Sequence, residues 1–264
     1  MKSVLTIAGS DSSGGAGVQA DIKTIAAHGL FAQSAITALT AQNTTGVYGV
    51  HDVPASFVAQ QIDVVFDDIR PDAVKIGMVS SAAIVEAIAS SLVRNKASNI
   101  VVDPVMVATS GSNLATDEAV MALREKLMPL AAVVTPNIPE AEVVAGCSIE
   151  TPDEQEAAAV AIAEELGVAA LVKGGHGMHD ANDALALPGG SLVWLRAERV
   201  DNPNTHGTGC TLSSAIACGL AQGLSIEDAT RQAKRYLTGA LEAQLNLGRG
   251  SGPLNHMWQF EFAS

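Results

Sequence analysis

The sequence is poor in aromatic residues and in positive charge. Phe, Trp and Tyr make up 3% of its 264 residues, which leaves few anchors for a partner surface. Its 15 Lys and Arg are outnumbered by 28 Asp and Glu, giving a formal net charge of −13, and such an acidic surface would repel nucleic acid. No window approaches ~18 uninterrupted apolar residues, so we expect no membrane span. The short apolar run Val4–Ala8 ends at glycine, which indicates a buried strand rather than a signal peptide and favours a cytoplasmic protein.

Cysteine is also scarce. Cys147, Cys210 and Cys218 cannot all pair, and their spacing matches no metal-binding motif, so a reducing compartment fits best. The chain is 48% apolar and only 16% charged, which excludes a disordered protein. No linker, repeat or low-complexity stretch interrupts it, and we therefore expect residues 1–264 to form a single domain.

Short β-like runs alternate with longer helical patterns. The helical patterns include Ile84–Val93, Ala157–Leu166 and Ile226–Leu245. This alternation predicts an α/β fold with a mostly parallel central sheet flanked by helices on both faces. Asp183–Leu187 and Ser191–Leu195, joined by Pro-Gly-Gly, predict an antiparallel hairpin. The remaining expected strands are runs of small and β-branched residues: Val4–Ala8, Ala73–Ile76, Asn99–Val102, Ala131–Val134 and Ala169–Val172.

A glycine-rich loop, Gly9–Gly17, follows the first expected strand. Four glycines in nine residues permit close approach of a ligand to the backbone, although an ordinary turn also fits. Gly15–Ala20 matches the permissive dinucleotide fingerprint, but no acid follows between Ile22 and His51 to hold a ribose. No Lys-Ser or Lys-Thr completes a phosphate-binding P-loop either. The loop therefore indicates a ligand site without specifying a nucleotide.

A second glycine loop precedes the apolar helical stretch Leu212–Leu220. Gly207, Thr208 and Gly209 would place backbone N–H groups at a helix N-terminus, which suits a phosphate or a developing oxyanion. Cys210 would lie in the first turn, where the pKa of a thiol is lowered. A glycine-rich helix start with an inert cysteine is the alternative.

Charged residues follow three expected strands, at the sheet edge where α/β proteins bind ligands. Asp103 and Glu140 could hold Mg²⁺, which needs few protein ligands, or could act only as caps. Lys173 could contact a phosphate or be a solvated strand end.

Taken together, these segments resemble the ribokinase-like superfamily, and within it the hydroxymethylpyrimidine/phosphomethylpyrimidine kinases of thiamine biosynthesis. The similarity covers about residues 4 to 256, with the motifs in family order. The motifs are Ile7–Asp21, Ala38–Thr44, Lys75–Met78, Val102–Met106, Thr135–Glu140, Lys173–His176 and Asn204–Ser213.

The resemblance implies a ribokinase-like α/β domain that uses ATP and Mg²⁺ to phosphorylate 4-amino-5-hydroxymethyl-2-methylpyrimidine and then its monophosphate. By the same resemblance, Gln42 would hydrogen-bond the aminopyrimidine, while Asp21 is a lesser candidate for contacting its amino group. Glu140 and Asp103 would organise Mg²⁺. The other implied site residues are Gly9, Ala16, Met78 and Val105 for the pyrimidine pocket, Lys173, Thr208 and Asn137 for ATP, and Cys210 with Gly207, Thr208 and Gly209 for catalysis.

Cys210 stands where many sugar kinases of the superfamily carry an Asp as base. Whether the thiol takes the proton of the attacked hydroxyl or only positions that hydroxyl stays open. A pyridoxal kinase of the same subgroup is the alternative activity. A non-catalytic sensor module is a weaker alternative, because such a module would be expected to lack Glu140 or the anion-binding loop Gly207–Gly209 (the anion hole), and both are present. Related kinases commonly dimerise, so a homodimer is expected.

Overall fold

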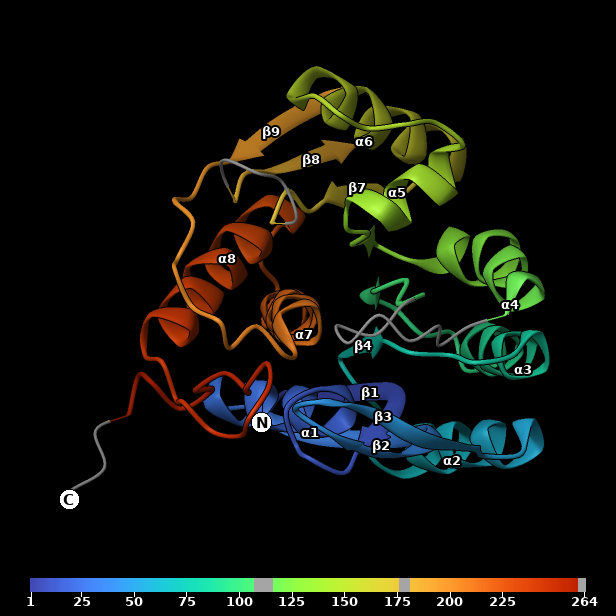
Figure 1. Cartoon of the computed structure of the whole chain (residues 1–264). Coiled ribbons are helices and arrows are strands. Elements are labelled where there is room, and N and C mark those ends of the chain that lie inside the picture. The colour runs from blue at the N-terminus through green and yellow to red at the C-terminus, as the bar shows by residue number, and fades with distance from the viewer. Residues whose placement is uncertain (107–115, 176–180, 261–264) are drawn as a thin grey trace.

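The computed structural model describes residues 1–106, 116–175 and 181–260. These residues contain a nine-stranded sheet of order β3-β2-β1-β4-β5-β6-β7-β8-β9 (Figure 1). The pairings from β2 through β1 and β4 to β7 are parallel, whereas β3, β8 and β9 pair antiparallel at the two edges. The strands are β1 (Ser3–Asp11), β2 (Phe31–Asn43), β3 (Gly46–Asp52), β4 (Ala73–Ile76), β5 (Ile100–Val102), β6 (Val133–Val134), β7 (Ala169–Val172), β8 (Asp183–Leu187) and β9 (Ser191–Leu195).

Helices cover both faces of the sheet, because alternate residues of the central strands are buried on opposite sides. In β7, Ala169 and Leu171 pack under α7 and α8, while Ala170 and Val172 face α5 and α6. Figure 1 shows α7 and α8 on the left of the sheet and α2 to α4 on the right. The helices are α1 (Gly17–Ala27), α2 (Ala55–Asp68), α3 (Ala82–Arg94), α4 (Asp117–Ala122), α5 (Ile138–Ala145), α6 (Pro152–Leu166), α7 (Thr208–Ala221) and α8 (Ile226–Glu242), with a π-helical turn η1 (Leu123–Leu127) and a 3-10 turn η2 (Met128–Leu130).

The structure confirms the predicted α/β class and the predicted hairpin, whose two strands have the expected bounds. It adds β2 and β3, which the strand pattern does not predict. β2 alternates buried and partly exposed residues and is rich in alanine, so it lacks the continuous β-branched signature of the central strands. Within the described ranges, no helix is both long and apolar enough to cross a bilayer.

Candidate active site

The site lies at the carboxyl ends of the parallel strands, where the two glycine loops meet. On one side, Gly9 ends the regular part of β1 and faces Met78 from β4. A Cβ placed at Gly9 would lie 3.0 Å from the Met78 sulfur, so a larger residue there would press on the Met78 side chain. Val105 is half-buried just beyond β5, and Ala16 is half-buried before α1. These four residues, which the resemblance implied for the pyrimidine pocket, come from three adjacent strand ends and one loop.

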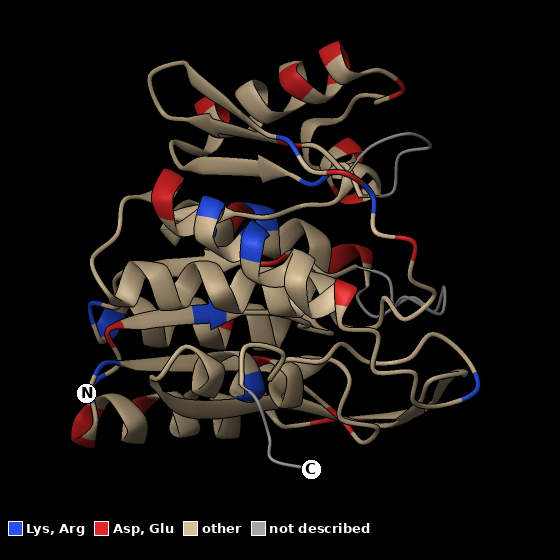
Figure 2. Cartoon of the chain, turned by 90° about the vertical axis from the view of Figure 1, so that its left-hand side faces the viewer, with Lys and Arg blue, Asp and Glu red and all other residues tan. Residues whose placement is uncertain are grey.

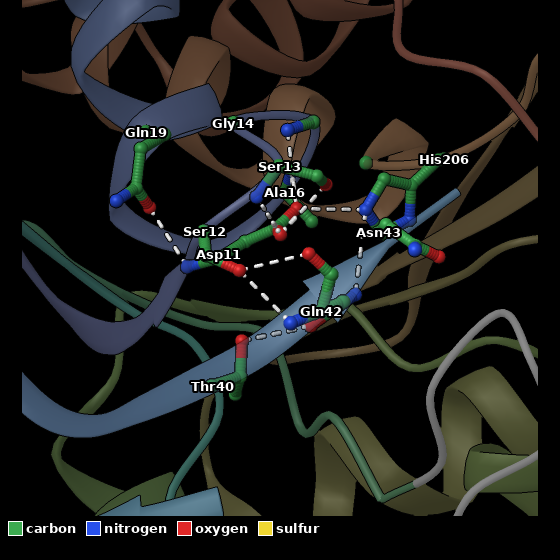
Figure 3. A network of polar contacts seen from close by, with 12 residues as sticks. Asp11, Ser12, Ser13, Gly14, Ala16, Gln19, Thr40, Gln42, Asn43 and His206 are labelled. Carbon is green, nitrogen blue, oxygen red and sulfur yellow. Dashed lines mark hydrogen bonds and ion pairs between the residues drawn. The ribbon is translucent and has the colours of Figure 1, made fainter. Parts of the chain in front are cut away.

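Asp11 ties the first glycine loop together and joins it to the second (Figure 3). Its carboxylate accepts hydrogen bonds from the backbone N–H groups of Ser13 (2.8 Å) and Ala16 (2.9 Å). It also forms a hydrogen bond with Nε2 of His206, 2.8 Å away, and His206 belongs to the second glycine loop. Burial would raise the pKa of Asp11, but the hydrogen bonds from His206 and Ser13 outweigh it and hold the pKa well below its usual value. The two loops are therefore connected through one buried carboxylate.

Gln42 lies at the end of β2, beside this network. Its backbone N–H donates to Ser12 Oγ at 2.9 Å, and the Ser12 hydroxyl donates back to its carbonyl at 2.8 Å. The side-chain amide lies between the Thr40 hydroxyl, 3.0 Å from Oε1, and His206, whose Nε2 is 3.4 Å from Nε2 of Gln42. The backbone of Gln42 is thus fixed on both sides, while its half-buried amide keeps part of its surface open.

The N-terminus of α7 forms the centre of the site. Gly207 is the N-cap residue, with φ of +88°, and has no side chain to satisfy the first-turn amides. A Cβ there would lie 2.0 Å from the carbonyl oxygen of Gly15, so the position needs glycine for both its conformation and its packing. The first-turn N–H groups and the positive end of the helix dipole therefore face the site, an arrangement suited to an anion.

A buried ion pair lies directly over this helix start. Lys173 Nζ is 2.8 Å from Asp103 Oδ1, and a Cβ at Gly209 would lie 3.2 Å from Asp103 and 3.5 Å from Lys173. Burial would raise the pKa of Asp103, but the Lys173 and Lys75 ammonium groups hold it below its ordinary value. Thr135 Oγ1 donates a further hydrogen bond to the carboxylate at 3.0 Å. Lys173, Asp103 and the start of α7 thus meet at one place, which is the arrangement that the predicted phosphate site requires.

Glu140 and Asn137 form a capping box at the start of α5. Asn137 Oδ1 accepts from the N–H of Glu140 at 2.9 Å, and Glu140 Oε2 accepts from the N–H of Asn137 at 2.8 Å. Glu140 therefore caps helix α5, which was one of the two roles expected for it. Burial raises the pKa of Glu140 to about 7; the nearby Lys173 opposes this rise and the Asp103 carboxylate adds to it.

The carboxylates of Glu140 and Asp103 fit the chemistry of Mg²⁺, although the described residues hold no cluster of three or more potential metal ligands. Mg²⁺ keeps most of its waters and needs only one or two protein carboxylates. A buried carboxyl group whose pKa is raised beside a second carboxylate is stabilised in its charged form by a cation. Glu140 and Asp103 are therefore the candidate residues for holding the metal.

The structure corrects one expectation about Cys210. Its position is as predicted, in the first turn of α7, and the N–H of Gly17 donates to its sulfur. Its pKa, however, is not lowered: burial raises the pKa of the thiol to about 11, and the Lys75 ammonium offsets only part of this effect. The helix-terminus rule assumes a solvated thiol, and here desolvation outweighs it.

A second correction concerns Asp21. Its side chain has no exposed surface and forms an ion pair with Lys75, so it is not placed to contact a substrate amino group. Sequence reasoning missed Lys75, as well as Asp11 and His206 of the loop network. Asp11 was the only acid in a glycine-rich loop, and His206 immediately precedes Gly207, but nothing in the sequence indicates that the two side chains meet.

A hollow of about 490 Å³ lies away from Cys210, between residues 196–200 and the C-terminal half of α8. Lys and Arg gather along α8 on this face of an otherwise acidic protein (Figure 2). Lys234 lines the hollow and pairs with Asp183 at 2.6 Å, and Asp183 in turn accepts from the N–H of Gly174 at 3.0 Å. The hollow is therefore connected to the residue next to Lys173 through a short chain of polar contacts.

Comparison with known proteins identifies the family. Residues 11–255 match the family model described as phosphomethylpyrimidine kinase. The chain is 52% identical over 256 residues to a hydroxymethylpyrimidine/phosphomethylpyrimidine kinase of Rhizobium meliloti, covering 96% of both chains. It is 49% identical to the thiamine biosynthesis bifunctional protein ThiED of Geobacter sulfurreducens, of which it spans about half: the match covers 97% of this chain and 52% of that protein.

Two solved structures are similar over most of the chain. A phosphomethylpyrimidine kinase from Clostridium difficile is 44% identical with a TM-score of 0.81, covering 90% of this chain and 98% of that one. An ADP complex of Bacillus subtilis pyridoxal kinase is 35% identical with a TM-score of 0.89, covering 98% of both. The fold is therefore the ribokinase-like fold of these vitamin kinases. With its strand-end site assembled around the start of α7, this chain belongs to the phosphomethylpyrimidine kinase family.

Proposed function

We propose that the protein transfers the γ-phosphoryl group of ATP to the hydroxymethyl group of 4-amino-5-hydroxymethyl-2-methylpyrimidine, and then to the monophosphate to give the diphosphate. The observation that carries this proposal is the place of Cys210. The Gly17 N–H of the first glycine loop donates to the Cys210 sulfur. Cys210 is also in the first turn of α7, beside Gly209, which lies close to Asp103 and Lys173. Phosphoryl transfer requires an acceptor oxygen and a donor phosphate aligned at one point, and the two halves of this site meet there.

On the acceptor side, Gln42 has the chemistry to recognise an aminopyrimidine. A carboxamide both donates and accepts, so it can pair with a ring nitrogen and the adjacent amino group. The backbone of Gln42 is fixed by Ser12, which orients the amide. Gly9, which has no side chain, and Met78 would supply an apolar surface for a flat ring.

On the donor side, Lys173, Thr208 and Asn137 would meet the phosphates of ATP, together with the first-turn N–H groups of α7. Asn137 pairs with Lys173 by a parallel backbone bridge, so the two lie side by side at neighbouring strand ends. Mg²⁺ held by Glu140 and Asp103 would neutralise charge on the transferred group. Fixed N–H donors and one buried cation supply the alignment and charge neutralisation that this chemistry needs.

The two steps differ in their need for a base. In the first, the hydroxymethyl group must lose its proton, and Cys210 in its thiolate form is the residue that would accept it. In the second, the attacking oxygen belongs to a phosphate whose second pKa is near 6, so it is already ionised at neutral pH. The amide groups at the start of α7 would serve both steps.

Product analysis tests this function. With the alcohol as the only acceptor, mass spectrometry should detect the monophosphate and then the diphosphate, with two ATP consumed per diphosphate. Lys173→Met should abolish both products, while the matched control Lys126→Met, an exposed lysine on η1, should form both at the parental rate. Accumulation of the monophosphate alone, or no ATP consumption, would contradict the proposal.

Pyridoxal phosphorylation is the second candidate, favoured by the TM-score of 0.89 to a pyridoxal kinase. Identity is higher, however, to the pyrimidine kinases, and Gln42 suits an aminopyrimidine better than the phenolic oxygen of pyridoxal. We therefore propose pyridoxal as at most a secondary substrate.

We further propose that residues 1–264 act as one domain of a cytoplasmic homodimer. Support for the dimer comes from the edge hairpin β2–β3, where Leu39, Tyr48 and Val50 are 48%, 69% and 48% exposed. Light scattering should give twice the 27.0 kDa chain mass, and a monomer mass would refute the dimer.

A further inference from the structure

A fully buried ion pair lies beneath the site and has no part in the reaction outlined above. Lys75 of β4 donates to both carboxylate oxygens of Asp21 of α1 at 2.9 Å, and neither side chain has any exposed surface. Two hydroxyl groups complete the cluster. Thr6 of β1 donates to Asp21 Oδ2, and Ser214 of α7 donates to Oδ1 at 2.8 Å. Residues of β1, β4 and α7 thus converge on one carboxylate of α1.

Three of these elements, β1, β4 and α7, have a site residue close to the residue that contacts Asp21. Gly9 follows Thr6 by three residues on β1, and Met78 follows Lys75 by three residues from β4. A Cβ at Gly77 would lie 2.7 Å from Lys75 Nζ, so the ammonium lies directly below the turn that carries Met78. The buried pair therefore holds both strands of the pyrimidine side at the positions where their site residues begin.

On α7, the hydrogen bond from Ser214 to Asp21 lies one helical turn beyond Cys210. Cys210 precedes Ser214 by four residues, which puts both on the same face of the helix. The charge of Lys75 also acts on Cys210, as it does on Asp103. Burial alone would lower the pKa of Lys75, but the Asp21 carboxylate outweighs it and keeps the pKa above its usual value, so the ammonium is charged.

The stability of the fold does not by itself explain a buried ion pair such as Asp21–Lys75. Desolvation of two charges can exceed their attraction, and replacing a buried pair by well-packed apolar residues is often neutral or stabilising. The surrounding strands are packed with apolar residues on both faces, and the Thr6 and Ser214 hydroxyls are the polar groups that an apolar pair would leave without their present acceptor.

We propose that the Asp21–Lys75 pair is a positioning device for the phosphoryl-transfer site: it fixes the Cys210 turn of α7 against the strand ends of Gly9 and Met78 and holds the Lys75 ammonium beneath them. This inference rests on the proposed function for its catalytic consequence. Its electrostatic consequence is independent of any substrate, because the reactivity of the Cys210 thiol can be measured without turnover.

The first measurement is the rate of Cys210 alkylation by iodoacetamide across pH 7–10, followed by peptide mass spectrometry in a Cys147→Ser background, since Cys147 is exposed. The charged groups that act on the thiol are Lys75, Asp21 and Asp103. Lys75→Met leaves two carboxylates facing the sulfur and should slow alkylation at pH 8 by about tenfold, one pKa unit. Asp21→Asn removes a carboxylate and should accelerate it. Opposite effects from two changes in one pair are expected of electrostatics but not of general loosening.

The second measurement uses an apolar double variant, Asp21→Leu/Lys75→Met. We expect its urea midpoint to stay close to that of the parent, while kcat for the alcohol falls about tenfold or more and KM for ATP changes little. The matched control is Lys2→Met/Asp72→Leu, because that exposed pair, 2.7 Å apart, joins the residues just before the same two strands, β1 and β4, at the far end of the sheet. The control should leave both kcat and alkylation unchanged.

The proposal is overturned if the two single variants shift alkylation in the same direction or not at all, or if the double variant keeps the parental kcat. If the double variant does not fold, Ser214→Ala decides, because it removes only the α7 hydroxyl from the cluster. An unchanged kcat and an unchanged alkylation profile in that variant would also overturn the proposal. If no pyrimidine is phosphorylated at all, the proposed function fails, and the alkylation results still decide the electrostatic role of the pair.

Discussion

Replacement of Cys210 by alanine separates the two chemical steps. Because burial raises the pKa of the thiol to about 11, only about one thiol in a thousand is ionised at pH 8. A positioned general base contributes ~10²–10⁴-fold to rate. We therefore expect Cys210→Ala to lower kcat for the alcohol by about 10²-fold or more. The monophosphate step begins from an ionised oxygen and should lose much less, because the first-turn amides of α7 remain in both steps.

The pH dependence gives the same distinction in the parent enzyme. The thiolate fraction grows as pH rises toward the pKa near 11, so the rate of the alcohol step should increase by up to about tenfold per pH unit between pH 7 and 10. The monophosphate step should be nearly flat above pH 7. Rapid-quench single turnovers with each acceptor, from pH 6.5 to 9.5, measure both profiles.

Cys210→Ser is the control for position. It keeps a small polar group but has a much higher pKa, so it should resemble the alanine variant if basicity matters and the parent if only placement matters. Comparable losses in both steps, or parallel pH profiles, would refute the base role and leave Cys210 as part of the scaffold around the helix start.

Three further changes test the remaining parts of the site. Gln42→Ala should weaken binding of the pyrimidine by about 1–3 kcal/mol, measured by calorimetry, while ATP affinity stays constant; equal losses for both ligands would remove Gln42 from the pyrimidine pocket. Glu140→Gln should raise the Mg²⁺ concentration required at fixed ATP. With the pKa of Glu140 near 7, the Mg²⁺ requirement of the parent should rise as pH falls from 8 to 6, and an unaltered titration in the variant would make Glu140 only a cap. Asp11→Asn should lower the free energy of urea unfolding by about 1–3 kcal/mol at pH 7. Because the pKa of Asp11 is held low in the folded protein, its stabilisation is present above about pH 4 and is lost as pH falls, so the difference from the parent should shrink in acid; a pH-independent difference would contradict this reasoning.

The central strands and the hairpin could be predicted because burial and turn formation select the residue types within each segment. Ala169–Val172 is buried on both faces and is a continuous apolar run, and Ala73–Ile76 is equally buried, with Lys75 as its one charged residue. β2 lies near the edge of the sheet and has no such run. Its place depends on pairing with β1 and β3, which residue patterns in a single sequence do not reveal.

Some contacts of the candidate site could be expected from the sequence, but its electrostatics could not. Lys173 and Asp103 follow strands that the pattern predicts, so their meeting at one sheet edge could be expected. The partners of Asp21 and Cys210 could not, because Lys75 lies 54 residues after Asp21 and is brought beneath both only by the fold. The same burial raises the pKa of Cys210, whereas its position at a helix N-terminus alone would predict a lowered pKa.

The most direct test of the proposed activity is kcat/KM for one enzyme preparation with three acceptors: the aminopyrimidine alcohol, its monophosphate and pyridoxal, each at saturating Mg²⁺ and ATP. We expect both pyrimidines to be phosphorylated, each with a kcat/KM well above that for pyridoxal. A higher value for pyridoxal, or failure to phosphorylate the monophosphate, would contradict the assignment of this site to the two successive pyrimidine phosphorylations.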